Sequence, residues 1–201
     1  MTSPCVDPEF FDTPDGVLTP QRRWQWAHRA TAEAGGASFV PANNAAGTTL
    51  FTTDVSWINN SGVSQQVYAT MTTGPARFQI DQLKHLVIQT QWGVALGAGP
   101  PTLTGESRIR GYADLGTQQI SGSTVGVWGV MEDRQPTLTV PVGDVLTVAA
   151  AGQISARVQV RWFTTAWGLD WHVGTWGDPI PYRQASVGAV RLDLYSVPVI
   201  P

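Results

Sequence analysis

The residues that could perform chemistry in this sequence are scattered, and only one small group of them is local. His172 lies between Asp170 and Asp178, and a histidine with two carboxylates could ligate a metal ion or act as an acid–base pair. The other histidines, His28 and His85, are isolated, and no His-x-x-x-His or Cys-x-x-Cys pair indicates zinc. Three such residues within nine positions are also common by chance. We therefore predict no metal site and no cofactor.

The usual nucleophile and nucleotide motifs are missing. The sequence contains no Gly-x-Ser-x-Gly, phosphate loop or dinucleotide fingerprint. Its single cysteine, Cys5, lies among prolines with no positioned base beside it. A glycosidase needs two carboxylates at a set separation, and the sequence does not pair the available Asp114, Glu132, Asp133 and Asp170. We expect a protein that is not an enzyme, and a polysaccharide hydrolase stays a rival hypothesis.

One segment is rich in tryptophan, with Trp162, Trp167, Trp171 and Trp176 inside fifteen residues. An indole ring has a flat apolar face and a donor edge, so exposed tryptophans on a loop can stack on sugar rings. Large aromatic side chains are also enriched at interfaces between subunits. A third interpretation is that they fill the end of a hydrophobic core. Trp167, Trp171 and Trp176 are therefore candidate glycan-binding or interface residues.

Composition excludes several classes of partner. Charged residues make up 13% of the chain, about half the usual quarter, and the net charge is −3. Lys84 is the only lysine, and no block of like charges indicates a nucleic-acid surface or a polybasic membrane patch. One cysteine allows no internal disulfide, no signal peptide opens the chain, and no apolar run is long enough for a membrane span. We expect synthesis in the cytoplasm, no nucleic-acid partner and no membrane insertion.

The first 46 residues predict an extended N-terminal arm. Its opening 23 residues carry four prolines, which prevent a continuous helix and supply no ladder donor. The candidate anchors that would dock this arm on a partner are Phe10, Phe11, Val17, Leu18, Trp24 and Trp26. A poorly ordered N-terminus is the alternative. The only serious helix candidate is 20–36, but Trp24, Trp26 and His28 alternate as in a strand, so we favour extended backbone over 22–30.

Residues 47–201 predict an antiparallel β-sandwich, jelly-roll-like, so the fold class is all-β. The stretch 49–73 alternates apolar and polar residues on both sides of Asn59-Asn60-Ser61-Gly62, which predicts a hairpin. Residues 77–96 predict one long strand, or two joined by a bulge near 82–84. The ranges 107–113, 124–130, 154–164 and 187–197 predict further strands, and 137–149 predicts two. Eight or nine strands without crossover helices favour two packed sheets.

Four stretches of the chain resemble a known family: PCVDPEFFDTPDGVLTPQ, WQWAHR, DVSWINNSGVSQQVYATMTTG and VRLDLYSVP. They are similar to minor tail proteins of phages that infect actinobacteria, and the similarity extends along most of the chain except for 162–176. The resemblance implies a virion structural subunit of the tail tip or its appendages, made in the host cytoplasm and located in the tail.

The same resemblance implies partners: other virion tail proteins and copies of this chain, as a homo-oligomer with a trimer favoured, together with a contribution to host attachment. It carries over no functional residue. Two alternatives stay open, a carbohydrate-binding module that recognises host cell-wall glycans and a capsid decoration protein.

Overall fold

The computed structural model describes residues 11–12, 19–20, 26–79, 84–112, 117–120, 123–126, 138–167 and 184–199. Within these ranges every regular element is a β-strand and every pairing of strands is antiparallel. The all-β prediction is confirmed. Among the described residues, no helix is long and apolar enough to cross a membrane.

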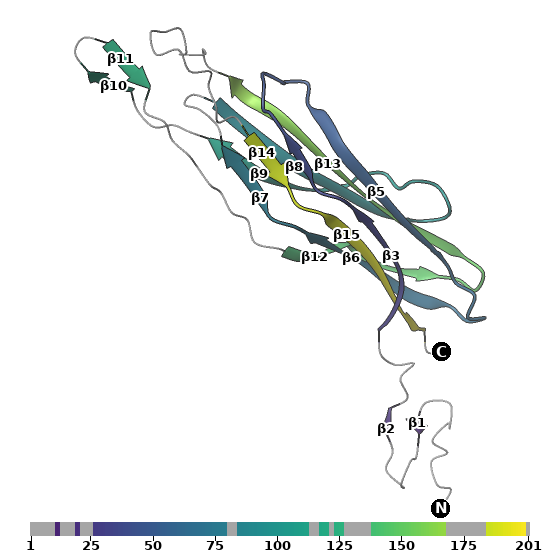
Figure 1. Ribbon diagram of the computed structural model, residues 1–201. Coiled ribbons are helices and arrows are strands. Elements are labelled where there is room, and N and C mark those ends of the chain that lie inside the picture. Colours follow the sequence, from purple (N-terminus) through teal and green to yellow (C-terminus); the bar gives the residue numbers. More distant parts are fainter. Residues whose placement is uncertain are drawn as a thin grey trace, which may run out of the picture.

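Two four-stranded sheets form the layers of the sandwich (Figure 1). The β15 sheet has the order β12-β6-β15-β3, and the β13 sheet has the order β5-β13-β8-β9. In the β15 sheet the strands are β12 (Leu138–Val148), β6 (Gln65–Thr73), β15 (Val190–Pro198) and β3 (Ala27–Ala34). In the β13 sheet they are β5 (Thr48–Ile58), β13 (Gln153–Trp167), β8 (Lys84–Leu96) and β9 (Gly105–Tyr112).

The pairing of these eight strands is nested. Counted along the chain, the first pairs with the last (β3 with β15), the second with the seventh (β5 with β13), the third with the sixth (β6 with β12) and the fourth with the fifth (β8 with β9). A long antiparallel ribbon that rolls up on itself gives this arrangement, which is the jelly roll. The predicted fold class is therefore confirmed at the level of strand order.

The core lies between the two sheets and is built from alternate residues of the central strands. In β13, Ile154, Ala156, Val158 and Val160 are fully buried, as are Leu192 and Leu194 in β15. Burying one aliphatic side chain contributes about 1.5–3 kcal/mol, so these positions dominate the stability of the fold. The alternation in 154–164 and in the last strand therefore predicted the inward faces correctly.

A third sheet continues the β15 sheet. It contains β4 (Ala37–Phe39), β14 (Gln184–Val187) and β7 (Ala76–Gln79) in the order β4-β14-β7. This order matches β3-β15-β6, because each short strand is joined to one of those long strands by two residues: 35–36, 188–189 and 74–75. Three neighbouring strands are thus interrupted at the same level. The third sheet contacts the β13 sheet through Phe39, which stacks on Trp162 with ring centroids 4.8 Å apart.

Glycine is required at this common break because the backbones approach closely. A Cβ on Gly74 would lie 2.8 Å from the Cα of Gly188, and one on Gly188 would lie 2.7 Å from the Cα of Gly74. A Cβ on Gly36 would lie 2.5 Å from the carbonyl oxygen of Val187. Hydrogen bonds cross the same line, from Gly74 N to Ala189 O at 2.7 Å.

The hairpin predicted over 49–73 is wrong in its pairing, although both strands exist. β5 pairs with β13, whereas β6 pairs with β12 and β15, so the two strands belong to opposite sheets. The six residues between them, 59–64, cross the end of the sandwich. Alternation reports which face of a strand is buried and is the same for any partner, so the pattern could not choose between a hairpin and a crossing.

Asn59 holds this crossing in place. It is fully buried, and its side-chain amide lies 2.7, 3.1 and 3.0 Å from the carbonyl oxygens of Val63, Val148 and Ala149. Its backbone bonds both residues of the turn at 151–152. The loop from β5 to β6 is thereby tied to the loop from β12 to β13.

Other expectations are corrected by strand assignments. The helix candidate 20–36 is wrong from residue 27 onward, where β3 confirms extended backbone, and 21–25 lie outside the described residues. The predicted division at residue 46 falls after β3 and β4, which pair with β15 and β14, so the sandwich includes 27–39. Alanine and threonine along β3 bury little apolar surface, so the alternation of apolar and polar residues that predicts a strand is weak there.

The remaining strand predictions differ in how runs are divided. The run 77–96 contains two strands of different sheets, β7 and β8, with 80–83 outside the described residues. The range 137–149 contains one strand, β12, with an irregularity between Val142 and Leu146 where Gly143 has a φ of 70°. Two small pairs complete the described chain: β1 (Phe11–Asp12) with β2 (Thr19–Pro20), and β10 (Thr117–Ile120) with β11 (Ser123–Gly126).

Candidate functional site

Four aromatic rings form a row on the outer face of the β15 sheet. Tyr68 in β6 and Tyr195 in β15 are direct partners across the two strands, and their rings stack with centroids 5.1 Å apart. His28 in β3 lies opposite Tyr195, with its ring edge-on at 5.4 Å. Trp26, just before β3, meets Tyr68 edge to face at 4.6 Å. We call these four residues the ring ladder.

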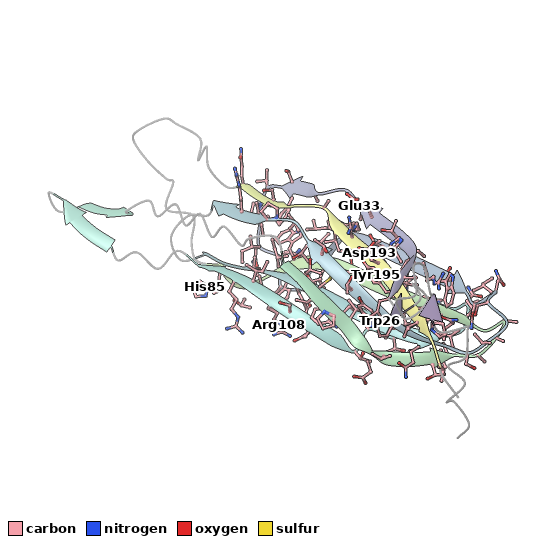
Figure 2. The ribbon with its side chains drawn as sticks, turned by 90° about the horizontal axis from the view of Figure 1, so that it is seen from below. Trp26, Glu33, His85, Arg108, Asp193 and Tyr195 are labelled. Carbon is pink, nitrogen blue, oxygen red and sulfur yellow. The ribbon has the colours of Figure 1, made fainter. Side chains whose placement is uncertain are left out.

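The ladder faces outward because its members have the parity opposite to the core. Val67 and Ala69 on either side of Tyr68 are buried, and Leu194 beside Tyr195 is buried as well. Adjacent strands in a sheet lie about 4.8 Å apart, so rings at paired positions come into contact. Trp26 is 42% exposed. Figure 2 labels Trp26 and Tyr195 among the side chains of the sandwich.

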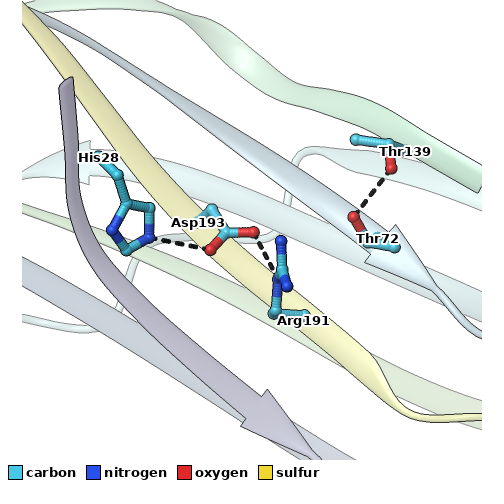
Figure 3. A network of polar contacts seen from close by, with 5 residues as sticks. All are labelled: His28, Thr72, Thr139, Arg191 and Asp193. Atoms are coloured by element: carbon cyan, nitrogen blue, oxygen red, sulfur yellow. Dashed lines mark hydrogen bonds and ion pairs between the residues drawn. The ribbon is translucent and has the colours of Figure 1, made fainter. Parts of the chain in front are cut away.

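Beside the ladder, Asp193 is a carboxylate that is only 3% exposed although it points to the same outer face. Its Oδ1 lies 3.0 Å from Nε2 of His28, and its Oδ2 lies 2.7 Å from Nε of Arg191 (Figure 3). A carboxylate only accepts, so both nitrogens donate. The His28 and Arg191 side chains are about half exposed and cover Asp193.

The ionisation of Asp193 follows from these contacts. Burial acts to raise its pKa, but hydrogen bonds from Arg191, Thr31 and His28 outweigh burial and hold the pKa of Asp193 below its ordinary value. The group is therefore ionised at neutral pH, and both of its oxygens are engaged. Such a carboxylate orients its neighbours and has no free oxygen to serve as a general base.

The arrangement is suited to contact with another molecule. Tyrosine, tryptophan and arginine are the side chains enriched at the centres of protein interfaces, and aromatic faces also bind sugars. In the part of the chain that the structure describes, no group of three or more His, Cys, Asp or Glu residues could hold a metal ion. We therefore treat the ring ladder, with Asp193 and Arg191, as the candidate functional site.

The structure describes only some of the residues predicted from sequence. Trp26 is a ladder member, and Phe11 lies in β1. The backbone of Trp167 ends β13. The other predicted residues lie outside the described ranges: Phe10, Val17, Leu18, Trp24, Trp171 and Trp176. The possible metal or acid–base group around His172 and the carboxylates at 114, 132, 133 and 170 lie outside them too.

Three ladder members, His28, Tyr68 and Tyr195, were not predicted as site residues. Their signal is an aromatic ring at a position whose parity faces solvent. Because a one-residue shift moves a side chain to the other face, that signal is readable only once the register is known. The pairing of Tyr195 with both Tyr68 and His28 supplied the register.

Fold and site together define a jelly-roll domain with a group of aromatic rings on one outer face. The chain belongs to the family described as Domain of unknown function (DUF7172), whose model matches residues 1–200. A search of curated protein sequences finds no relative that matches.

Among solved structures, this chain is similar to a chain in the structure of infectious bursal disease virus strain Gx, with 10% identity and a TM-score of 0.32. The match covers 93% of this chain and 35% of the viral chain. The VP2 subviral particle of the same virus gives 12% identity, a TM-score of 0.30, and coverage of 98% and 38%. This chain spans little more than a third of the length of those structures. The fold assignment above rests on the strand pairing of this chain alone.

Proposed function

We propose that this chain is a structural subunit of a phage virion, a minor tail protein of the tail tip or its appendages. The resemblance of four sequence stretches to minor tail proteins of actinobacterial phages points to this class. The ring ladder is the structural observation that supports assembly through protein–protein contacts, because exposed rings on a flat sheet face are what interfaces use. The jelly roll itself serves many functions, so the fold adds no specific role.

In this proposal the chain is a homo-oligomer, with a trimer favoured, that contacts other tail proteins and contributes to host attachment. The mass of the purified chain in solution, measured by light scattering, tests the oligomer directly. A trimer or a larger ring is expected, and Trp26→Ala should shift the population toward monomer. Val40→Ala is the matched control, since Val40 is 70% exposed and is not a ladder member. A wild-type chain that stays monomeric at high concentration contradicts the proposal.

The N-terminal segment is the proposed tether between subunits. The sequence places its apolar residues Phe10, Phe11, Val17 and Leu18 among prolines, which prevent a continuous helix. A chain that lacks residues 1–23 should fold, because the described sandwich begins at β3, but it should no longer enter phage particles. Normal incorporation of the truncated chain would rule out the tether.

A second candidate function, binding of host cell-wall glycans, is favoured by the exposure of Trp26. An indole that is 42% exposed can stack on a sugar ring, and its fluorescence would then change on titration. If cell-wall fragments quench the wild-type fluorescence and not that of Trp26→Ala, this candidate replaces the first. Labelling of particles with an antibody separates tail from capsid and so tests the variant in which the chain decorates the capsid.

A further inference from the structure

The outer face of the β13 sheet carries a second surface, of a different character from the ring ladder. Arg108 in β9 and Arg161 in β13 both lie beside the ring of Phe163, with guanidinium carbons 6.0 and 5.7 Å from its centroid. Arg110 lies in the same row as Phe163, because both pair with Val87 of β8. We call Arg108, Arg110, Arg161 and Phe163 the arginine patch.

The patch carries positive charge that the described chain does not neutralise. Arg108 pairs with Glu106 at 2.9 Å, and Arg161 donates to the carbonyl oxygen of Ala46 at 2.9 Å. Within the described ranges the Nε of Arg161 is buried and has no hydrogen-bond partner. Among the described residues Arg110 is exposed and makes no ion pair. Three arginines against one carboxylate leave +2 on this surface of a chain whose net charge is −3.

The opposite charge is concentrated in the N-terminal segment. Residues 1–21 carry four acidic side chains, Asp7, Glu9, Asp12 and Asp15, and no lysine or arginine. The same segment carries Phe10 and Phe11, and aromatic rings bind the faces of guanidinium groups. Acidic and phenyl groups are thus the chemical complement of a surface that carries arginines beside a phenyl ring.

The point at which the N-terminal segment joins the sandwich lies far from the arginine patch. Trp26 lies at one end of the sandwich. The next residue, Ala27, pairs with Ser196, which donates a hydrogen bond to Gln65 at 3.1 Å. Gln153, the first residue of β13, lies at the same end. Arg161 lies eight residues further along β13, which at about 3.3 Å per residue is about 26 Å away, and it belongs to the other sheet. In Figure 2 Trp26 and Arg108 likewise lie apart along the sandwich. Copies placed head to tail bring the acidic segment of one to the patch of the next.

We propose that the acidic N-terminal segment of one copy docks on the arginine patch of a second copy. This inference rests on the proposed function, in which the segment is a tether, and it names the surface that receives the tether. The interface is heterologous, since the two contacting surfaces differ, and repetition of such a contact closes a ring when the rotation between copies allows it.

Binding of a labelled peptide with the sequence of residues 1–20 tests the contact. The full-length wild-type chain should bind it, more weakly as salt rises, because salt screens exposed charges. Arg110→Glu should weaken binding about tenfold, since it removes an attraction and adds a repulsion. Arg77→Glu is the matched control, an exposed arginine in β7 outside the patch, and should leave binding unchanged. A peptide that does not bind, or that binds Arg110→Glu equally well, overturns the inference.

A mixing experiment decides whether the contact is between copies. One full-length variant carries Arg110→Glu, and a second carries lysine at positions 7, 9, 12 and 15. Each should lose mass in light scattering relative to the wild type, and the mixture should form a heterodimer through the intact segment of the first and the intact patch of the second. No gain of mass on mixing would mean that each segment binds its own chain, which contradicts the proposal.

These outcomes separate the two proposals. An oligomeric wild type whose mass is unaffected by Arg110→Glu leaves the proposed function standing and removes the inference. A monomeric wild type that binds no peptide removes both. A general polyanion site, instead of a docking site, would be identified by three results together. Polyphosphate would displace the peptide, it would bind the wild type and Arg77→Glu equally tightly, and mixing the two variants would give no gain of mass.

Discussion

Replacing Asn59 by alanine tests the claim that one buried amide ties together two loops at the end of the sandwich. The amide NH2 of Asn59 has two hydrogens and is within 3.1 Å of three carbonyl oxygens, while its Oδ1 accepts from the backbone N and the hydroxyl of Ser61 at 3.2 and 2.7 Å. Alanine removes all of these bonds and leaves the carbonyl of Val148 without this donor in a buried position.

The expected loss follows from counting those bonds. A buried hydrogen bond contributes about 1 kcal/mol, and a buried polar group left without a partner costs about 1–3 kcal/mol. Two donated bonds and two accepted bonds, one of the latter from the exposed Ser61 hydroxyl, therefore predict a loss of about 2–4 kcal/mol in the free energy of unfolding. In a domain of this size that loss lowers Tm by about 5–15 °C.

Urea unfolding followed by tryptophan fluorescence measures this free energy. Asn60→Ala is the matched control, because Asn60 is the exposed neighbour in the same loop, and it should change stability by less than about 0.5 kcal/mol. Asn59→Asp keeps an acceptor but places a carboxylate against carbonyl oxygens, so it should destabilise at least as much as alanine. Equal stabilities for Asn59→Ala and Asn60→Ala would refute the reasoning.

Two further predictions concern the glycine break and the buried carboxylate. Gly188→Ala should lose about 1–3 kcal/mol of unfolding free energy, because its Cβ would lie 2.7 Å from the Cα of Gly74. Gly35→Ala is the control and should lose less than about 0.5 kcal/mol, because a Cβ there meets nothing within 4 Å. Equal losses in urea unfolding would contradict this prediction. Asp193→Asn should lose about 1 kcal/mol at pH 7, since its ion-pair partners are half exposed. Folding lowers the pKa of Asp193, so its contribution is present above the unfolded value of about 4 and is lost as the pH falls through the folded value. The gap in stability between wild type and Asp193→Asn should therefore close on acidification, and a gap that persists at about pH 2 would refute the assignment.

The sequence predicted the faces of the strands better than their partners. In the predicted strands 154–164 and 187–197, alternation puts Val158 and Leu192 on the apolar face, and both are fully buried. The partner of β5 could not be assigned in this way, because the jelly roll pairs strands that are distant in sequence and the loop at 59–64 has the turn residues of a hairpin. Local turn chemistry determines how tightly the chain can reverse, and tertiary packing determines whether it reverses within one sheet or crosses to the other.

The candidate site was predictable only at Trp26. Aromatic residues in alternating strands usually belong to the core, as Trp57 does, and Tyr68 differs from it locally only in parity, which indicates a face and not the neighbouring rings. Asp193 shows the converse difficulty. Its parity places it outside, yet Arg191 and His28 cover it so completely that it is buried. Contacts between β3, β6 and β15 create this site, and no stretch of sequence contains all three strands.

The scarcity of charge in this chain has a structural counterpart that bears on assembly. On the outer faces several charged groups are paired locally: Asp54 accepts two bonds from Arg157 at 2.6 and 2.9 Å, and Asp193 accepts from Arg191. A charge that is already paired loses less hydration when another protein covers it. A face built of such pairs and of hydroxyl groups therefore has a smaller desolvation cost on contact with another protein than a face of unpaired ions. Arg110 is exposed, has no ion-pair partner in the described chain and shares its surface with Arg108 and Arg161, and this concentration of positive charge is the reason to expect a carboxylate of another molecule there.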